Sequence, residues 1–374
     1  MNLEGNWEVE KIISEVVIRN DLISKEQLTV IREHNGAGGI AVWGTGRAGS
    51  YAVNYLLKND IHPVCVTDSF DHAEGSEFEG IPLLSAQNFF ARFPNALVIM
   101  ACLYVHGVDK LLKEKGYHYL TFDTTLLNQC IAPISYQEYI KKGREGIDEV
   151  YALLADEVSK FTYEQLIKYR LSFDRKYINS INQQHIYFGN DVVPSFSGKT
   201  FVDCGAFTGD TLLDFFNSKS CWCESYYALE PSHKNFGYLQ EMIRSHNITW
   251  AVPLEVGAWD REDTLRFSDN LSMSSSVSQM GETTINVDSL DHLLSSKNIN
   301  FIKMDIEGAE KQAILGAKSI IQEQNPILAL SIYHKPEDFW ELPLLIKSIN
   351  KKCRMYIRHH TSYSADTVLY CVPE

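Results

Sequence analysis

Residues 201–211 read FVDCGAFTGDT: a hydrophobic strand that ends in Asp203, a turn that contains Gly205 and Gly209, and the start of an amphipathic helix. In an open parallel sheet, ligands bind beyond the carboxyl ends of the strands, where loops meet helix N-termini. Glycines at that place allow the backbone to approach a ligand closely. The charge of Asp203 opposes a pyrophosphate but suits an ammonium group or hydroxyls. The segment therefore favours a cofactor that carries an amino acid.

The next apolar strand carries a second acid at its end. Residues 225–232 read SYYALEPS, which places Glu230 about 20 residues beyond the glycine turn, where an acid usually binds the two hydroxyls of an adenosine ribose. Each acid alone is more often a helix cap than a ligand. Two acids at consecutive strand ends, with a glycine turn between them, predict an S-adenosylmethionine site.

A third strand end is also acidic. Residues 301–317 read FIKMDIEGAEKQAILGA, a buried strand followed by Asp305, Glu307 and the turn residue Gly308. Residues two apart on a strand point to the same side, so we expect both carboxylates to face the pocket. The alternative is that they stabilise a helix N-terminus, and it applies more to Glu307 than to Asp305.

Two further strands end in basic residues. LALSIYHKPED places His334 at a strand end, and MYIRHH places Arg358 and His359 at another. Strand ends of one sheet meet at one edge, which predicts that these side chains gather around the site. We predict His334 as the general base, with Asp305 either orienting it or accepting the proton itself, and Glu307, Arg358 and His359 as substrate-binding residues.

No metal site is predicted. The histidine spacing is not that of a metal motif, and the eight cysteines are scattered without CxxC pairs, which is typical of reduced core thiols. The alternative is Mg²⁺ bound by Asp305, Glu307 and His334.

Seven segments in order resemble the FkbM-type S-adenosylmethionine-dependent methyltransferases: VDCGAFTGDT, ALEPSHKNF, VGAWD (256–260), INVDSLD (285–291), FIKMDIEGAE, SIYHKPEDFWELP and YIRHH. The resemblance spans about residues 185–374. It implies a seven-stranded class I methyltransferase sheet. It also implies O-methylation of a hydroxyl on a sugar, nucleotide-linked sugar, glycan or related natural product, as in polysaccharide biosynthesis.

The resemblance also implies roles for individual residues. The cofactor-binding positions that it carries over are Asp203, Gly205, Ala206, Phe207, Gly209, Asp210, Thr211, Glu230, Pro231, Ser232, Gly257, Ala258 and Asp305. Among them, Glu230 would hold the ribose and Asp305 would lie beside the methionine part and the reacting methyl group.

A second glycine turn lies near the N-terminus. Residues 44–49 read GTGRAG after an apolar strand, and Asp68 ends the next strand, a pattern that fits a dinucleotide fingerprint. The segment loosely resembles small Rossmann-like modules of surface-polysaccharide and nucleotide-sugar enzymes. We predict that Gly44, Gly46 and Asp68 bind a nucleotide or nucleotide-linked sugar, and tight packing or a role in interaction are the alternatives. An NAD(P)-dependent or nucleotide-sugar-binding oxidoreductase, or a noncatalytic binding protein, is the rival function.

The pattern of elements predicts an α/β protein with two Rossmann-like domains joined by helices, with parallel sheets and right-handed crossovers. The predicted parts are N-terminal helices at 1–38, a small Rossmann-like domain at 39–128, a helical connector at 129–190 and a methyltransferase domain at 191–374.

The composition narrows the partners. The chain has 374 residues and a formal net charge of −14, which disfavours nucleic acid and anionic membranes. Neither a membrane-spanning run nor a basic signal segment is apparent, so we expect a cytoplasmic protein. Its expected partner is a small-molecule or glycan acceptor, and a homo-oligomer is left open.

Overall fold

The computed structural model describes residues 8–16, 25–102, 105–121, 136–172, 174–268, 276–277, 283–361 and 364–374. The chain divides into two compact units, residues 1–16 with 136–374, and residues 17–135. The two predicted N-terminal helices are shared between them: α1 (Val9–Glu15) belongs to the first unit and α2 (Lys25–Ala37) to the second. The predicted domain boundary at residue 128 lies outside the described residues.

The unit of residues 17–135 contains one sheet in the order β3-β4-β2-β1-β5-β6. All its neighbouring strands are parallel except β3, which is antiparallel to β4. The predicted strand before the glycine turn and the predicted strand that ends at Asp68 are both present, whereas β3 and β4 were not predicted. Its elements after α2 are β1 (Ile40–Trp43), α3 (Arg47–Lys58), β2 (Cys65–Asp68), β3 (Glu77–Phe78), β4 (Ile81–Ser85), α4 (Ala86–Arg92), β5 (Leu97–Met100), α5 (Val105–Glu114) and β6 (Tyr119–Thr121).

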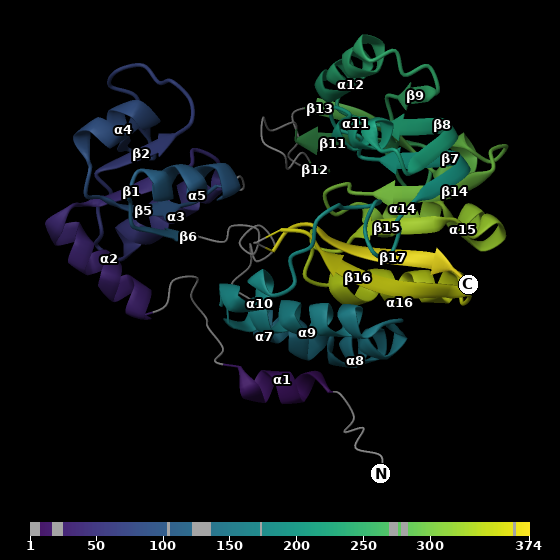
Figure 1. Cartoon of the computed structure of the whole chain (residues 1–374), viewed down its shortest axis with the longest axis horizontal. Helices are drawn as coiled ribbons and strands as arrows, with labels where there is room; N and C mark the ends of the chain where they lie inside the picture. The colour runs from purple at the N-terminus through teal and green to yellow at the C-terminus, as the bar shows by residue number, and fades with distance from the viewer. Residues whose placement is uncertain are drawn as a thin grey trace. The chain divides into compact units, whose positions relative to one another are not determined.

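The other unit is built on a seven-stranded sheet in the order β16-β17-β15-β14-β7-β8-β9 (Figure 1). Its strands are β7 (Phe196–Cys204), β8 (Cys221–Leu229), β9 (Ala251–Leu254), β14 (Ile299–Met304), β15 (Ile327–Ser331), β16 (Cys353–His359) and β17 (Thr367–Pro373). The helices that follow α1 are α7 (Tyr136–Lys142), α8 (Arg144–Leu153), α9 (Glu157–Ser172), α10 (Arg175–Asn179), α11 (Asp210–Asn217), α12 (His233–Ser245), α13 (Leu290–Leu293), α14 (Glu310–Gly316), α15 (Lys318–Gln324) and α16 (Asp338–Ile349).

A smaller sheet stands beside it in the order β10-β13-β11-β12. Its strands are β10 (Gly257–Ala258), β11 (Asp263–Ser268), β12 (Ser276–Val277) and β13 (Thr283–Asp288).

The last strand corrects the expectation of parallel sheets throughout. β17 is antiparallel to both β15 and β16. The chain returns from His359 to Thr367 through a short connection, and a parallel pairing would need a crossover of a dozen or more residues. β16 and β17 therefore form a hairpin at the end of the sheet.

The predicted helical connector packs along this end of the sheet. Helix α9 packs on β16, α8 packs on α16 and α10 packs on α9. Isolated bridges join Leu154 to Met355 and Asn182 to His359. The helix α1 packs against α8 and α9, where the Val9 N–H donates to Asp148 Oδ1 at 2.8 Å. The connector is thus a layer of the unit built on the seven-stranded sheet and not a free linker.

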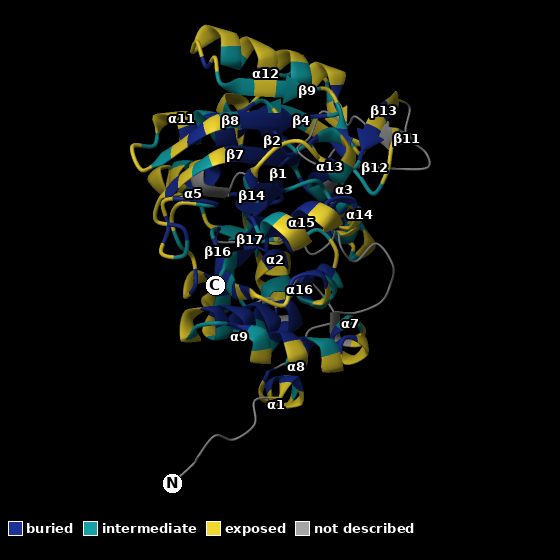
Figure 2. Cartoon of the chain, turned by 90° about the vertical axis from the view of Figure 1, so that its right-hand side faces the viewer, coloured by how far each residue is buried: buried dark blue, intermediate teal, exposed yellow. Residues whose placement is uncertain are grey.

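Aromatic side chains fill the centre of the large sheet. Phe201, on β7, stacks on Tyr226 of β8 with ring centroids 4.6 Å apart and on Phe301 of β14 at 4.4 Å. The three residues are register partners, so their rings form a ladder across the strands. Figure 2 shows the contrast between buried β14 and the exposed outer face of α12. This ladder stabilises the register of β7, β8 and β14, whose carboxyl ends border the site described below.

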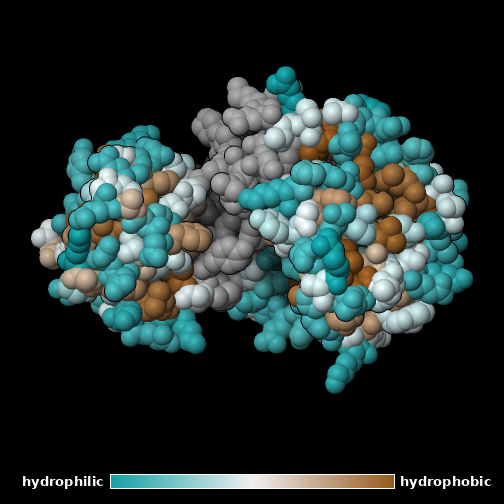
Figure 3. Space-filling view, turned by 90° about the horizontal axis from the view of Figure 1, so that it is seen from above, coloured by the Kyte–Doolittle hydropathy of each residue, from teal (hydrophilic) through white to brown (hydrophobic). Residues whose placement is uncertain are grey.

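Within the described residues, no helix is long and apolar enough to cross a membrane. The face shown in Figure 3 is mainly hydrophilic, with apolar residues in small groups between polar ones.

Candidate active site

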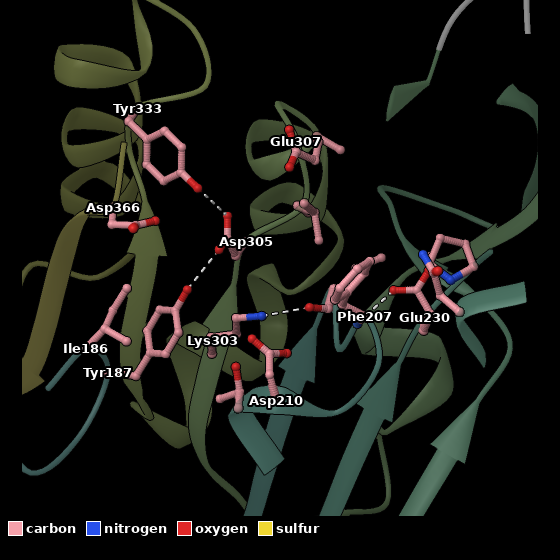
Figure 4. A pocket seen from close by; sticks show the side chains of 18 of the residues that line it. Ile186, Tyr187, Phe207, Asp210, Glu230, Lys303, Asp305, Glu307, Tyr333 and Asp366 are labelled. Carbon is pink, nitrogen blue, oxygen red and sulfur yellow. Dashed lines mark hydrogen bonds between the residues drawn. The ribbon is translucent and has the colours of Figure 1, made fainter. Parts of the chain in front are cut away.

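A cavity of about 320 Å³ opens beyond the carboxyl ends of β7, β8 and β14 (Figure 4). The predicted residues that line it are Gly205, Phe207, Asp210, Thr211, Glu230, Pro231, Gly257, Ala258, Asp305 and Glu307. Those that do not line it are Asp203, Ala206, Gly209, Ser232, His334, Arg358 and His359. Ten of the residues predicted for this unit thus surround one cavity and seven do not line it, and their roles in binding stay predictions.

The glycine turn after β7 forms the floor of the cavity. Gly205 has φ +80°, and a Cβ there would lie 2.0 Å from the carbonyl oxygen of Asp305. Gly209 has φ +91°, and its Cβ would lie 2.1 Å from Met242 Cε. Phe207, between them, also has a positive φ of 50° although it is not glycine, and such strain is typical of functional sites. The turn therefore brings its backbone close to the cavity, while its N–H groups at Gly205, Ala206, Phe207 and Gly209 bond within the protein.

Glu230 is fixed at the end of β8 with its carboxylate at the cavity. Its Oε2 accepts the Phe207 N–H at 2.9 Å, and its Oε1 accepts the Ser232 N–H at 2.9 Å. Burial raises the pKa of Glu230 to about 7 in spite of these hydrogen bonds. Each carboxylate oxygen keeps a second lone pair, so Glu230 can accept hydrogen bonds from two neighbouring hydroxyls.

An apolar slot lies next to Glu230. Pro231, Ala258, Ile285 and Val287 line this side of the cavity. At Gly257, an added Cβ would lie 3.1 Å from Val287 Cγ1, so the slot is narrow. A narrow apolar slot beside a hydroxyl-binding carboxylate fits the adenine and ribose of an adenosine.

Asp203 lies below the cavity and not in it. The Tyr226 hydroxyl donates to Asp203 Oδ2 at 2.8 Å, and Lys303 Nζ lies 2.8 Å from Oδ1. Lys303 also donates to the Gly205 carbonyl at 2.7 Å. Burial lowers the pKa of Lys303, but the charges of Asp203 and Asp305 more than offset this and raise it. The prediction that Asp203 contacts the cofactor is therefore wrong, because its carboxylate already serves a buried lysine.

Asp305 presents its carboxylate to the middle of the cavity (Figure 4). Its Oδ2 accepts the Tyr187 hydroxyl at 2.8 Å, and its Oδ1 accepts the Tyr333 hydroxyl at 3.2 Å. Burial raises its pKa, but the charges of His334 and Lys303 outweigh burial, so the pKa is below its usual value. Asp305 is thus a fixed anion that can face a cationic ligand.

His334 is buried among carboxylates. Its Nδ1 lies 2.9 Å from Glu310 Oε1, and its Nε2 lies 3.3 Å from Asp305 Oδ1 and 3.7 Å from Glu307 Oε2. Burial lowers its pKa, but the carboxylates of Glu310 and Glu307 outweigh burial and raise it to about 10. A protonated imidazole cannot accept a proton at neutral pH. The raised pKa thus disfavours His334 as the general base, and that role stays a prediction.

Glu307 and Asp366 are the other acids at this end of the cavity. Both line it, and both have a left-handed backbone with φ 56°. Burial raises the pKa of each carboxyl group to about 7. Asp366 precedes β17 and was not among the predicted residues, because no motif in the sequence marks it.

Arg358 and His359 lie away from the cavity on β16. Arg358 Nη2 donates to Asp156 Oδ2 at 2.8 Å and to Asp191 Oδ2 at 2.7 Å. The His359 Nδ1 lies 2.9 Å from Thr367 Oγ1. The connector helices cover this edge of the sheet, so the predicted substrate-binding role of both residues is wrong and Arg358 is a structural tie.

Tyr187, Lys303, Tyr333 and Asp366 are among the cavity residues that sequence reasoning missed. For Lys303 a signal existed: it precedes Asp305 by two positions in an otherwise apolar strand, so it points to the same side. Tyr187 comes from the segment before β7, and its sequence carries no comparable signal.

The glycine turn of the other unit is engaged within that unit. A Cβ at Gly44 would lie 2.2 Å from the Ala101 carbonyl oxygen, which explains the glycine by packing. Asp68 accepts the Thr45 hydroxyl at 2.6 Å on Oδ2, and His72 Nε2 lies 2.6 Å from Oδ1. Binding of a nucleotide by Gly44, Gly46 and Asp68 stays a prediction.

Comparison with solved structures supports the fold. A crystal structure of methyltransferase FkbM from Methylobacillus flagellatus KT matches with a TM-score of 0.69 and 22% identity, covering 97% of this chain and 97% of that chain. A putative rRNA methylase from Clostridium thermocellum matches at a TM-score of 0.32 and 11% identity, over 54% of this chain and 93% of that one. Aeropyrum pernix fibrillarin, solved with natively bound S-adenosyl-L-methionine, matches at 0.32 and 10%, over 49% and 70%.

No curated protein matches the chain. A family comparison matches residues 203–362 to the Methyltransferase FkbM domain. The match falls on the unit that contains the cavity. This range contains the glycine turn, Glu230 and Asp305, whereas residues 17–135 lie outside it and their Rossmann-like assignment stays a prediction. Residues 203–362, which carry most of the cavity, are therefore similar to the Methyltransferase FkbM domain.

Proposed function

We propose that the protein transfers a methyl group from S-adenosylmethionine to a hydroxyl of a sugar, nucleotide-linked sugar, glycan or related natural product. The observation that carries the proposal is the arrangement of Glu230, the Gly205 turn and Asp305 around one cavity. S-adenosylmethionine contains an adenosine and a cationic amino-acid part, and these three features along the cavity fit the ribose, the amino-acid part and the positive charge.

Different residues bind different parts of S-adenosylmethionine, the methyl donor. Glu230 accepts the ribose hydroxyls, and the slot of Pro231, Ala258 and Val287 takes the adenine. The turn at Gly205 lies against the amino-acid part, and the anionic Asp305 compensates the positive charge beside the reacting centre. Such fixed charges cost no reorganisation during reaction, which makes them effective.

The donor supplies an electrophilic methyl carbon on sulfur: the acceptor oxygen bonds to that carbon, the carbon–sulfur electron pair goes to sulfur, and the hydroxyl proton leaves. Alignment of the two reactants contributes most, about 7 to 11 kcal/mol when they are held in attack geometry. We assign the proton to Asp366, whose carboxylate lines the cavity next to Tyr333 and whose pKa is about 7, close to the working pH.

The acceptor end of the cavity suits a polyhydroxylated molecule. Tyr187, Tyr333, Glu307 and Asp366 surround Asp305 there (Figure 4) and offer hydrogen-bond donors and acceptors. A sugar ring presents several hydroxyls to such a set. Among the described residues that line the cavity the lysine is Lys303, which already pairs with Asp203, and this disfavours a phosphate at the reacting position.

Calorimetry on the full chain tests the donor. We expect S-adenosylmethionine and its demethylated product to bind, and Glu230→Ala to weaken binding at least tenfold. Glu255→Ala is the matched control, because Glu255 is exposed and pairs only with His233 at 2.7 Å among the described contacts. Absence of binding to either compound would refute the proposal.

The acceptor is tested separately. Incubation with labelled donor and a panel of sugar nucleotides and glycans should add one methyl group to at least one of them, seen by mass spectrometry. Donor binding together with methylation of only nitrogen or carboxylate acceptors would retain the methyltransferase and overturn the hydroxyl acceptor.

A further inference from the structure

The segment of residues 185–193, here called the strap, precedes β7 and forms one wall of the cavity through Ile186, Tyr187 and Phe188. Its backbone has an unfavourable conformation: His185 has φ 62° and Tyr187 has φ 67°, in the left-handed region that residues other than glycine rarely adopt. Such strain persists only where the surrounding contacts over-determine it. The contacts that hold the strap are therefore part of how the cavity is built.

The hydroxyl of Tyr370, on β17, holds the strap. It accepts the Tyr187 N–H at 3.1 Å and Asn190 Nδ2 at 3.1 Å, and His360 Nε2 lies 3.1 Å from the same oxygen. Burial lowers the pKa of His360 to about 4, so the ring is neutral. Its Nδ1 lies 3.3 Å from the Gln183 carbonyl oxygen and carries the hydrogen, because a carbonyl can only accept. Nε2 therefore accepts the Tyr370 hydroxyl, which donates one hydrogen bond and accepts two.

Asn190 closes the strap on itself. Its Nδ2 also donates to the His185 carbonyl at 3.1 Å, and its Oδ1 accepts the N–H groups of Val192 and Val193 at 3.0 and 2.8 Å. All four hydrogen-bonding positions of the amide are thus used. Asn190 and Tyr370 are both buried. A buried polar network in which every group is satisfied makes the segments that it joins rigid.

The strap brings the side chain of Tyr187 to Asp305. The Tyr187 hydroxyl donates to Asp305 Oδ2 at 2.8 Å, and the Tyr333 hydroxyl donates to Oδ1 at 3.2 Å (Figure 4). Hydrogen bonds donated to a carboxylate favour its ionised form and fix its orientation. Both the charge and the direction of the Asp305 carboxylate therefore depend on where the strap holds Tyr187.

We infer that Tyr187 is a positioning residue for Asp305, and that the Tyr370 hydroxyl holds Tyr187 in place through the strap. The inference rests on the proposed function, in which Asp305 faces the positive charge of the methyl donor. Tyr187, Asn190 and Tyr370 lie outside residues 203–362, the range that matches the Methyltransferase FkbM domain. Segments on both sides of the matched range thus combine to fix a carboxylate that lies within it.

The test compares S-adenosylmethionine with S-adenosylhomocysteine, its demethylated product, by calorimetry on the full chain. The two ligands differ in the methyl group and in the positive charge on sulfur, so the ratio of their dissociation constants reports how well Asp305 faces that charge. We expect Tyr187→Phe and Tyr370→Phe each to shift the ratio against S-adenosylmethionine by about threefold or more, because hydrogen bonds to charged groups are stronger than neutral ones. A general loosening of the fold would weaken both ligands alike. Tyr238→Phe is the matched control, because Tyr238 is 55% exposed on α12.

The double variant Tyr187→Phe/Tyr370→Phe tests whether Tyr370 acts through Tyr187. Its ratio should shift no further than that of Tyr187→Phe alone, because both substitutions remove the same interaction. An unshifted ratio in Tyr187→Phe, or an additive shift in the double variant, would overturn the inference. Should Tyr370→Phe fail to fold, Tyr187→Phe decides, because it removes only a hydroxyl at the cavity and keeps the backbone bond to Tyr370.

The same titrations separate this inference from the proposed function. An unaltered chain that binds neither ligand refutes the proposed function and the positioning role with it. An unaltered chain that binds both ligands, with no shift of the ratio in the variants, refutes the positioning role alone.

Discussion

Lys303 Nζ lies 2.8 Å from Asp203 Oδ1, and the two residues are register partners on β14 and β7 with side chains almost fully buried. The same ammonium group donates to the carbonyl of Gly205, the first glycine of the cavity floor. The ion pair therefore links the centre of the sheet to the turn on which a ligand would rest.

Loss of this lysine should destabilise the fold. Lys303→Met leaves the Asp203 carboxylate buried without a counter-charge, and removing one partner of such a pair costs about 3–5 kcal/mol. Urea unfolding measures the difference. Lys311→Met is the control: Lys311 forms an exposed pair with Glu341 at 2.7 Å, and its loss should cost no more than about 1 kcal/mol. Equal effects of the two substitutions would contradict a structural role for the buried pair.

Donor affinity should depend on pH through Glu230. Burial raises the pKa of Glu230 to about 7, so the carboxyl group is protonated in part of the free chains at neutral pH. Ribose hydroxyls donate best to the ionised form. Affinity for S-adenosylmethionine should therefore rise from pH 6 to pH 8 and then level off, as calorimetry at several pH values can show.

The variant Glu230→Gln isolates this effect. It keeps one acceptor oxygen and has no charge to titrate, so its affinity should be lower by about tenfold or more and independent of pH in this range. An unchanged pH slope in the variant would assign the titration to another group.

Asp366 should act on turnover and not on donor binding. Asp366→Asn removes the proton acceptor while keeping the size of the side chain, so the rate should fall about 100- to 10,000-fold. The dissociation constant of the donor should stay within about twofold. Single-turnover methyl transfer and calorimetry measure the two quantities. A variant that retains the normal rate on a true acceptor would remove Asp366 from the mechanism.

Arg358 should matter for stability alone. Arg358 is 1% exposed, and its guanidinium donates to Asp156 and Asp191. Asp156 lies in the connector, and Asp191 lies in the segment before β7. Arg358→Met breaks charged hydrogen bonds, each worth about 1.5–3 kcal/mol, and should lower the unfolding free energy by at least about 2 kcal/mol. Donor affinity at 20 °C should not change. A large loss of acceptor binding in a folded variant would restore the substrate-binding role.

The ends of β7, β8 and β14 could be predicted from the sequence because each strand is an apolar run that stops at an acid. Asp305 and Glu307 both line the cavity, but β14 ends at Met304 and Glu307 has a left-handed backbone, so strand alternation does not explain its position. The same alternation makes Asp203 a neighbour of Lys303 and not of a ligand, which becomes evident only once the two strands are aligned in register.

Distant partners explain the wrong predictions. Asp156 and Asp191 are 202 and 167 residues from Arg358 in the sequence, and no local pattern connects them. In the same way, His334 is at the expected strand end, but its pKa is raised by Glu310, at the start of α14, and by Glu307, in the turn before that helix. Position along the chain predicts where a side chain lies and does not predict its protonation.

The packing of α1 on α8 and α9 has a consequence for how the protein can be divided. Val9 and Ile12 are buried there, so residues 17–135 are an insertion between two segments of a single folding unit and are tethered at both ends. A fragment that starts at residue 136 would expose to water the surface of α8 and α9 that α1 covers. A fragment of residues 1–130 would contain α1 without the helices on which it packs. A deletion of residues 17–135 that joins residue 16 to residue 136 through a flexible linker would keep α1 together with the helices on which it packs.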